Sequence, residues 1–205
     1  MIAATRASKS QLYHYFGDKH GLLEAAVDYQ SAVVLGFHAR ALAAADSWER
    51  LERWAAEMVE VFERQGSRGG CPIGTLGAAL SDSDELLRGV LNEAFITWRH
   101  AISGALVRLR DNQLLADDAD IEALTTTTLA AIQGGLLLAK TMRETSQLRV
   151  VLYNVVAHLR AYAPPDAQQN PAQPIHDPAR DSSRVRPGAR LAGSGRIGNA
   201  SNLRA

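Results

Sequence analysis

The 205-residue sequence has few of the features that mark disulfide-bonded, secreted or membrane proteins. It contains one cysteine, Cys71, so no disulfide bond can form within the chain, which fits a reducing compartment such as the cytoplasm. Residues 1–6 have no long apolar core and do not resemble a signal peptide. The longest strongly apolar run, residues 129–140, is interrupted by Gln133, Gly134 and Gly135, and we expect it to be too short and too broken to span a membrane.

The formal net charge at pH 7 is zero, because 22 Lys and Arg residues balance 22 Asp and Glu residues. A zero total does not exclude nucleic-acid binding, which depends on a local patch. Residues 1–20 carry such a patch, with Arg6, Lys9 and Lys19 against Asp18 alone. We therefore treat the N-terminal residues as a candidate nucleic-acid interface.

Signatures of catalysis and of metal or cofactor binding are missing too. No nucleophile elbow and no dinucleotide fingerprint occurs, no Glu-x-x-His pair recurs, and the six histidines are scattered. The acidic group Asp82, Asp84 and Glu85 is typical of a solvated helix start. We expect neither an enzyme nor a cofactor or metal site.

What the sequence does contain is helical periodicity, and it predicts an all-α fold. Apolar residues recur at steps of three and four through most of residues 8–162. Start and stop signals divide this region into helices over about 8–16, 19–45, 46–62, 71–80, 83–111, 119–138 and 147–162. The pattern favours Asp46 as the cap of the third helix, and either Ser83 or Asp84 as the start of the fifth. Gly134 and Gly135 are poor helix formers, so we expect them to allow close packing between two helices.

The first predicted helix has a donor-rich face. Ser8 and Gln11 form a capping-box pattern, and Leu12 and Phe16 share one apolar face. Gly17 ends the helix, and Asp18 can cap the next one, whose first turn contains Lys19. A short helix with such a polar face suits a DNA groove, although aromatic packing in any helical protein is an alternative.

Residues 3–23 resemble the helix-turn-helix of TetR/AcrR-family transcription repressors, through the run Leu-Tyr-His-Tyr-Phe at 12–16 followed by Lys19. The family's first helix and most of its second are absent, and Arg6 stands where the family commonly has glycine. The resemblance therefore implies an N-terminally truncated regulator. It implies a partial DNA-binding head at 1–28 and a helical ligand-binding and dimerisation domain at 29–163. The proline-rich, basic composition of residues 164–205 predicts a disordered tail.

By the same resemblance, seven residues would contact operator DNA. Lys9, Ser10 and Gln11 would face bases, and phosphates would be held by Tyr13, His14, Tyr15 and Lys19. Gln11 raises a conflict, because a side chain that closes the capping box cannot also read a base.

Residues 65–71 form a glycine-rich loop, which we interpret as a flexible connection, since no strand precedes it and no Lys-Ser/Thr pair follows. Residues 69–77 resemble TetR regulators related to LmrA and YxaF. Cys71 begins the next helix, where a helix N-terminus would favour a reactive thiol. The favoured interpretation is nevertheless a small buried residue.

Two sets of apolar residues complete the predicted sites. Two facing apolar stripes should surround a pocket for a small, largely apolar effector, and they consist of Trp54, Met58, Phe62, Leu91, Phe95 and Trp98. The interpretation that these residues are simply part of the core has equal weight. The last two helices should form the homodimer surface, through Gly135, Leu152, Val155, Val156 and Leu159.

These patterns predict a cytoplasmic, ligand-responsive transcriptional regulator, most simply a repressor, that forms a homodimer without a membrane or cofactor. It is expected to bind operator DNA if the head is complete, and poorly or not at all as residues 1–205 alone. The alternative is a small-molecule-binding helical dimer that does not bind DNA, because its head is incomplete.

Overall fold

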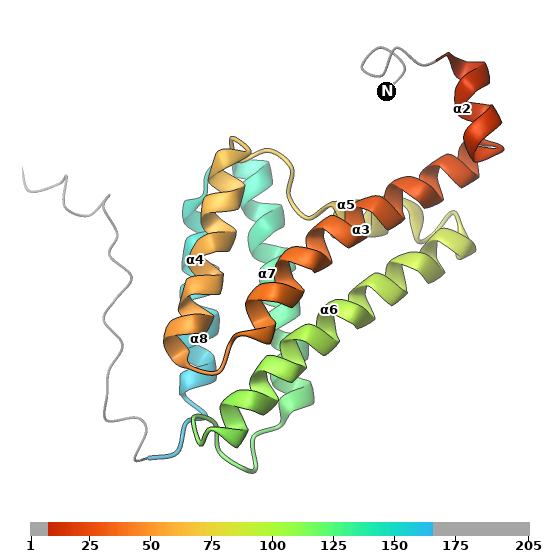
Figure 1. The fold of residues 1–205 in the computed structure, drawn as a ribbon. Helices are drawn as coiled ribbons and strands as arrows, with labels where there is room; N and C mark the ends of the chain where they lie inside the picture. Colours follow the sequence, from red (N-terminus) through yellow and green to blue (C-terminus); the bar gives the residue numbers. More distant parts are fainter. Residues whose placement is uncertain (1–7, 166–205) are drawn as a thin grey trace, which may run out of the picture. The chain divides into compact units, whose positions relative to one another are not determined.

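Residues 8–165 are described by the structure, a computed structural model, and they form helices and connecting turns without any β-strand. Figure 1 shows the order of these helices along the chain. They are α2 (Lys9–Phe16), α3 (Lys19–Ala43), α4 (Trp48–Arg64), α5 (Pro72–Leu80), α6 (Glu85–Asp111), α7 (Ile121–Met142) and α8 (Ser146–Arg160).

Most of the helices begin where a polar side chain caps the backbone. The side chains of Ser8, Asp18, Asp84 and Asp120 each accept a hydrogen bond from the amide three residues later. The sequence predicted the caps at Ser8 and Asp18, and it placed the starts of α6 and α7 to within one residue, at Ser83 or Asp84 and at Ala119-Asp120. For α4 the cap is Ser47, which accepts from the Arg50 amide at 3.4 Å, one residue after the Asp46 that the pattern favoured.

Gly17 separates α2 from α3 because it adopts a positive φ of 75°, which costs glycine little. Asp18 Oδ1 then accepts the Gly21 N–H at 2.9 Å and starts α3. From there α3 runs without a break to Ala43, so the proposed domain boundary at residue 28 lies inside a continuous helix. The predicted tail, 164–205, lies almost wholly outside the described residues.

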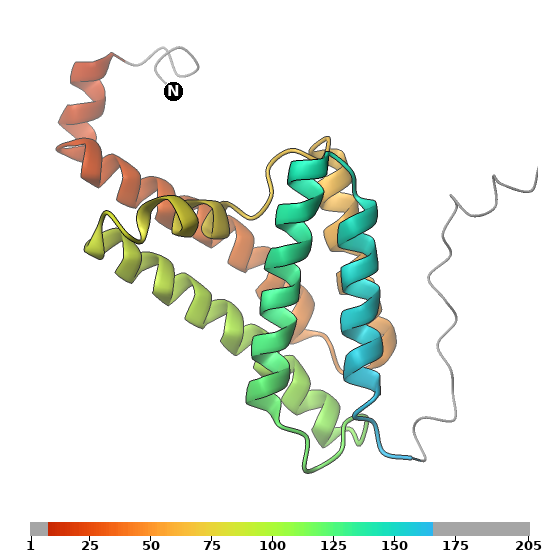
Figure 2. The ribbon, with the colours of Figure 1, turned by 180° about the vertical axis from the view of Figure 1, so that it is seen from behind.

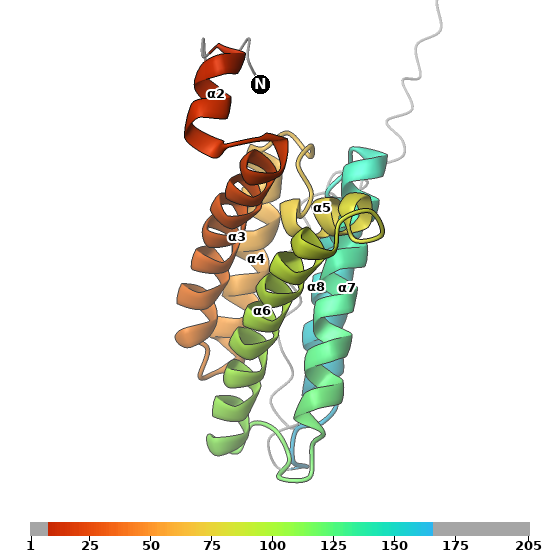
Figure 3. The ribbon, with the colours of Figure 1, turned by 90° about the vertical axis from the view of Figure 1, so that its right-hand side faces the viewer.

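The long helices α3 and α6 pack against each other, and α5 contacts both (Figures 1 and 3). On the other side, α7 and α8 lie next to each other, with α4 packed against α8, as Figure 2 shows. The core between these groups is apolar and includes Leu42, Ile73, Leu87, Leu106, Leu109 and Leu148. This arrangement leaves one broad face of α7 and α8 without cover from the rest of the described chain.

The structure corrects the predicted homodimer surface. Leu152, Val155, Val156 and Leu159 are all buried within the single chain, where α8 packs against α7 and α4. Gly135 also faces inward, because a Cβ there would lie 3.2 Å from Val151 and 3.3 Å from Leu148. These residues hold α7 to α8. The exposed apolar side chains of the two helices are others: Leu137, Leu138, Met142, Val150 and Tyr153.

Helix α7 is longer than its broken sequence pattern suggested. Gly134 and Gly135 lie within it, and over an 18-residue window its mean hydropathy is 1.3. By length and composition alone it is the one helix of residues 8–165 that is apolar enough to cross a membrane. However, a core helix of a helical bundle passes the same test, and Leu124, Thr128 and Ile132 on its inner face are buried.

Candidate functional site

A cavity of about 660 Å³ lies between α3, α4 and α5, with contributions from α6, α7 and the loop before α5. Its walls are mostly apolar, and none of its lining residues is charged. The lining residues are Ala26, Gln30, Val33, Val34, Phe37, His38, Met58, Val61, Phe62, Gln65, Gly69, Gly70, Cys71, Pro72, Thr75, Leu76, Trp98 and Leu136. A cavity of this size and chemistry suits a small organic molecule.

Half of the residues predicted for an effector pocket lie at this cavity. Met58, Phe62 and Trp98 line it. Trp54 and Leu91 are almost fully buried in the core, and Phe95 packs against that core. The core interpretation therefore holds for these last three. Sequence reasoning missed the walls that α3 and α5 supply.

The most constrained polar group at the cavity is His38, which is only 4% exposed. The indole Nε1 of Trp54 donates a hydrogen bond to His38 Nδ1 at 3.1 Å. The imidazole stacks on Trp98, with ring centroids 4.1 Å apart, and meets Phe37 edge to face. Burial lowers the pKa of His38 to about 3, so the ring is neutral at physiological pH.

Cys71 lines the cavity as the cap of α5. Its Sγ accepts the Gly74 N–H at 3.3 Å and lies 3.5 Å from the Gln133 side-chain nitrogen. Burial raises the pKa of the Cys71 thiol despite these contacts. A thiol that remains protonated reacts slowly with oxidants, so the geometry favours the small buried residue over the thiol sensor.

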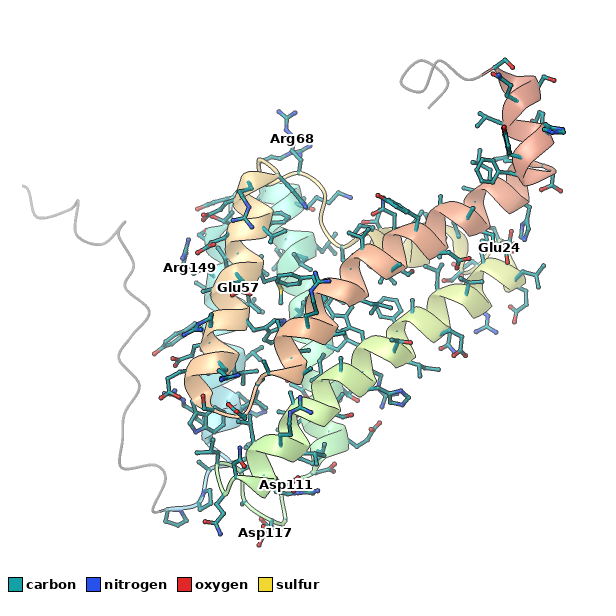
Figure 4. All side chains as sticks on the ribbon, viewed as in Figure 1. Glu24, Glu57, Arg68, Asp111, Asp117 and Arg149 are labelled. Atoms are coloured by element: carbon teal, nitrogen blue, oxygen red, sulfur yellow. The ribbon has the colours of Figure 1, made fainter. Side chains whose placement is uncertain are left out.

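The loop that precedes α5 reaches the cavity through Gly69 and Gly70. Arg68 points away from the helices into solvent, as Figure 4 shows. The loop thus provides part of the cavity wall, and its one cation is not directed into it.

At the other end of α3, helix α2 presents an exposed polar surface. Ser10, Gln11, Tyr13, His14, Tyr15 and Lys19 are all exposed, and the side chain of Lys9 lies outside the described residues. Leu12 is half-buried, whereas Phe16, expected as part of an apolar anchor, is 37% exposed.

The capping box is present, since Gln11 Oε1 accepts the Ser8 N–H at 2.8 Å and Ser8 Oγ accepts the Gln11 N–H. The Gln11 side chain thus closes the capping box in this structure.

Helix α3 connects the two regions and is tied to α6 near both ends. His20 Nδ1 lies 2.9 Å from Asp84 Oδ2 at the start of α6. Arg108, near the end of α6, donates to the Leu42 carbonyl in the last turn of α3. These two contacts join α3 to α6 on both sides of the α3 residues that line the cavity.

No group of three or more His, Cys, Asp or Glu side chains among residues 8–165 is placed to hold a metal ion. The second, small cavity near Arg99, His100 and Glu122 is about 100 Å³ in volume.

The fold is similar to that of a solved structure. The solved crystal structure of the regulatory protein TetR from Rhodobacter sphaeroides matches with a TM-score of 0.71 and 23% sequence identity. The match covers 77% of this chain and 84% of that one. Comparison with curated proteins gives no significant match.

The amino-acid sequence also matches the model of a protein family. The family model for the C-terminal domain of LmrA/YxaF-like transcriptional regulators matches residues 47–153, slightly more than half of the chain. The chain therefore belongs to the LmrA/YxaF-like TetR family of transcriptional regulators. Regulators of this family are generally not enzymes.

Proposed function

We propose that this chain is a ligand-responsive transcription repressor that acts in the cytoplasm and binds operator DNA as a homodimer. The observation that carries this proposal is the double role of α3. Six of its residues line the cavity, from Ala26 to His38, and its first turn follows directly on the exposed helix α2. Ligand and DNA would thus act on one continuous helix.

The proposed mechanism is a shift between two positions of α3. A ligand that enters the cavity favours the position in which its contacts with Val34 and Phe37 are best. Because α3 is continuous from the cavity to Lys19, the shift moves α2. In a dimer the two copies of α2 must lie about 34–36 Å apart to enter successive major grooves, and a changed spacing releases the DNA.

The DNA contacts can be tested with duplexes selected from a random-sequence pool. We expect enrichment of a two-fold symmetric site, and Lys19→Ala should weaken binding to every enriched sequence about tenfold. The lost phosphate contact should also reduce the salt slope by about 1. Arg64→Ala removes the same charge from the exposed end of α4 and should leave the DNA affinity unchanged.

Equal effects of the two variants would contradict the placement of Lys19. Failure to enrich any duplex would instead support the alternative function, a small-molecule-binding helical dimer without DNA binding.

The dimer is proposed to form through the exposed face of α7 and α8. Leu138 is 46% exposed and Val150 is 58% exposed, which is unusual for apolar residues on two adjacent helices. Leu138→Arg and Val150→Arg should convert the dimer into a folded monomer in analytical sedimentation, because a charge at a buried interface is costly. Val155→Arg should instead unfold the chain, since Val155 is a core residue.

Leu86→Arg is the matched control, because Leu86 is 72% exposed and lies at the start of α6. A dimer that survives Leu138→Arg and Val150→Arg but dissociates with Leu86→Arg would place the interface elsewhere. A dimer through this face would cover part of the apolar window of α7, of which 39% is buried within one chain.

A further inference from the structure

The tautomer of His38 is fixed by its partner. An indole N–H can only donate, so the hydrogen bond from Trp54 Nε1 requires an unprotonated Nδ1. A neutral imidazole then carries its proton on Nε2. His38 is therefore held as a hydrogen-bond donor through one defined atom.

The orientation of that donor is fixed as well. Trp98 covers one face of the ring at an interplanar angle of 28°, and Phe37 meets it edge to face at 5.0 Å. Nε2 makes no hydrogen bond to any other residue within 8–165 and is not among the unpartnered buried nitrogens sealed within that part of the chain. Since His38 lines the cavity, Nε2 remains accessible to a molecule bound there.

The same contact opposes the cationic form. A proton on Nδ1 would face the Trp54 N–H, so an imidazolium would lose this hydrogen bond and set two donors against each other. Burial acts in the same direction and keeps the pKa of His38 low. Lys140 is beside the lining rather than part of it, and its Nζ donates to Thr75 Oγ1 at 3.3 Å at an exposed position of α5. A carboxylate would therefore find no charge partner at His38.

We propose that the ligand of this cavity is a neutral, largely apolar molecule that presents an acceptor oxygen, such as a ketone carbonyl, to the Nε2–H of His38. This inference rests on the proposed function of the cavity as the effector site. His38 would be the residue that selects among apolar molecules of similar shape, and Trp54 would be the positioning residue that sets its tautomer.

The test uses matched probes of one shape: fluorene, 9-fluorenone and 9-fluorenone-4-carboxylate, with xanthene and xanthone as a second pair. Dissociation constants are measured by equilibrium dialysis. In the unmodified chain we expect each ketone to bind about tenfold more tightly than its hydrocarbon, the size of one buried neutral hydrogen bond. The carboxylate should bind more weakly than fluorenone.

His38→Phe keeps the aromatic stack and removes the donor, so the ratio between ketone and hydrocarbon should fall to about one. The double variant His38→Phe and Trp54→Phe removes both partners of the Trp54–His38 hydrogen bond and leaves no buried donor without an acceptor. It serves as the test if the single variant His38→Phe does not fold. His158→Phe, at an exposed position on α8, should keep the ratio. Because each ratio is taken within one variant, general losses of affinity cancel.

Gln30→Leu and Thr75→Val address two of the rival donors at the cavity. If the ratio survives His38→Phe, the inference is wrong, and a fall in either of these variants would then identify the donor. A preference for the carboxylate, or equal binding of ketone and hydrocarbon by the unmodified chain, would also overturn it while leaving the cavity as a ligand site. If no probe binds, the proposed function of the cavity fails, and the inference with it.

The tautomer has a readout independent of ligands. Nitrogen-15 spectra of histidine-labelled protein at pH 7 should show one ring protonated at Nε2 only, absent in His38→Phe. In Trp54→Phe this ring should change to a mixture of tautomers. An imidazolium, or a proton on Nδ1, would contradict the proposed donor.

Discussion

Lowering the pH from 7 to 5 should reduce the free energy of unfolding by about 2 kcal/mol through His38 alone. Burial lowers the pKa of His38 to about 3 in the folded chain, against 6.5 when exposed. Below pH 6.5 the unfolded chain binds a proton that the folded chain does not, so stability falls as the pH falls. The loss is about 1.4 kcal/mol per pH unit and continues until the pH reaches about 3.

Chemical denaturation at several pH values measures this slope, and His38→Phe supplies the comparison. The variant should start from lower stability, because Trp54 loses its acceptor. Its stability should nevertheless change by about 2 kcal/mol less than that of the unmodified chain between pH 7 and 5. The lowered pKa values of Glu49 and Glu85 act only at lower pH, near and below the usual carboxyl range. Parallel slopes in the two proteins would show that His38 is not a buried neutral group.

The sequence predicted the helices well because their ends depend on local chemistry. Ser8, Asp18, Asp84 and Asp120 each cap a helix through an amide three residues away, and a pattern of four residues contains that information. The error at α4 has the same origin, since Asp46 and Ser47 are both good caps and only one of them occupies the cap position.

The cavity was predicted only in part because it depends on contacts between distant segments. Periodicity identified apolar stripes on α4 and α6, but it does not reveal which stripe residues face a neighbouring helix and which face a void. Trp54 and Met58 are one helical turn apart, yet Met58 lines the cavity and Trp54 does not. A polar signal was available at His38, which interrupts an apolar stretch of α3.

The dimer surface was misplaced for a related reason. The apolar stripe of α8 that contains Leu152 and Val155 packs inward, and a stripe of this kind is indistinguishable in sequence from one that packs against a second subunit. The residues proposed now, Leu138 and Val150, lie on faces that the chain leaves exposed. Only the packing of α7 on α8 shows which apolar residues of the two helices face inward and which remain exposed.

Filling the cavity from α5 should abolish the response to ligands and spare the fold. Leu76 lines the cavity from a helix remote in sequence from α2. Leu76→Trp places a larger ring into the open volume of about 660 Å³, so the empty chain loses little stability. A bound molecule must then compete with that ring. Overfilling costs about 1–3 kcal/mol, which corresponds to roughly 5- to 150-fold weaker binding of any neutral aromatic probe that occupies the cavity.

The matched control is Ala79→Trp, which adds the same ring at an exposed position of α5. DNA affinity, measured in gel shifts without probe, should be equal in Leu76→Trp, Ala79→Trp and the unmodified chain, because none of these changes reaches α2. Addition of a probe should release DNA from the unmodified chain and from Ala79→Trp, whereas Leu76→Trp should remain bound. Release from Leu76→Trp at the same probe concentration would mean that the effector acts from a different site. Loss of DNA binding without probe would mean instead that the cavity walls set the active position of α3, because a ring in the cavity would then mimic the ligand.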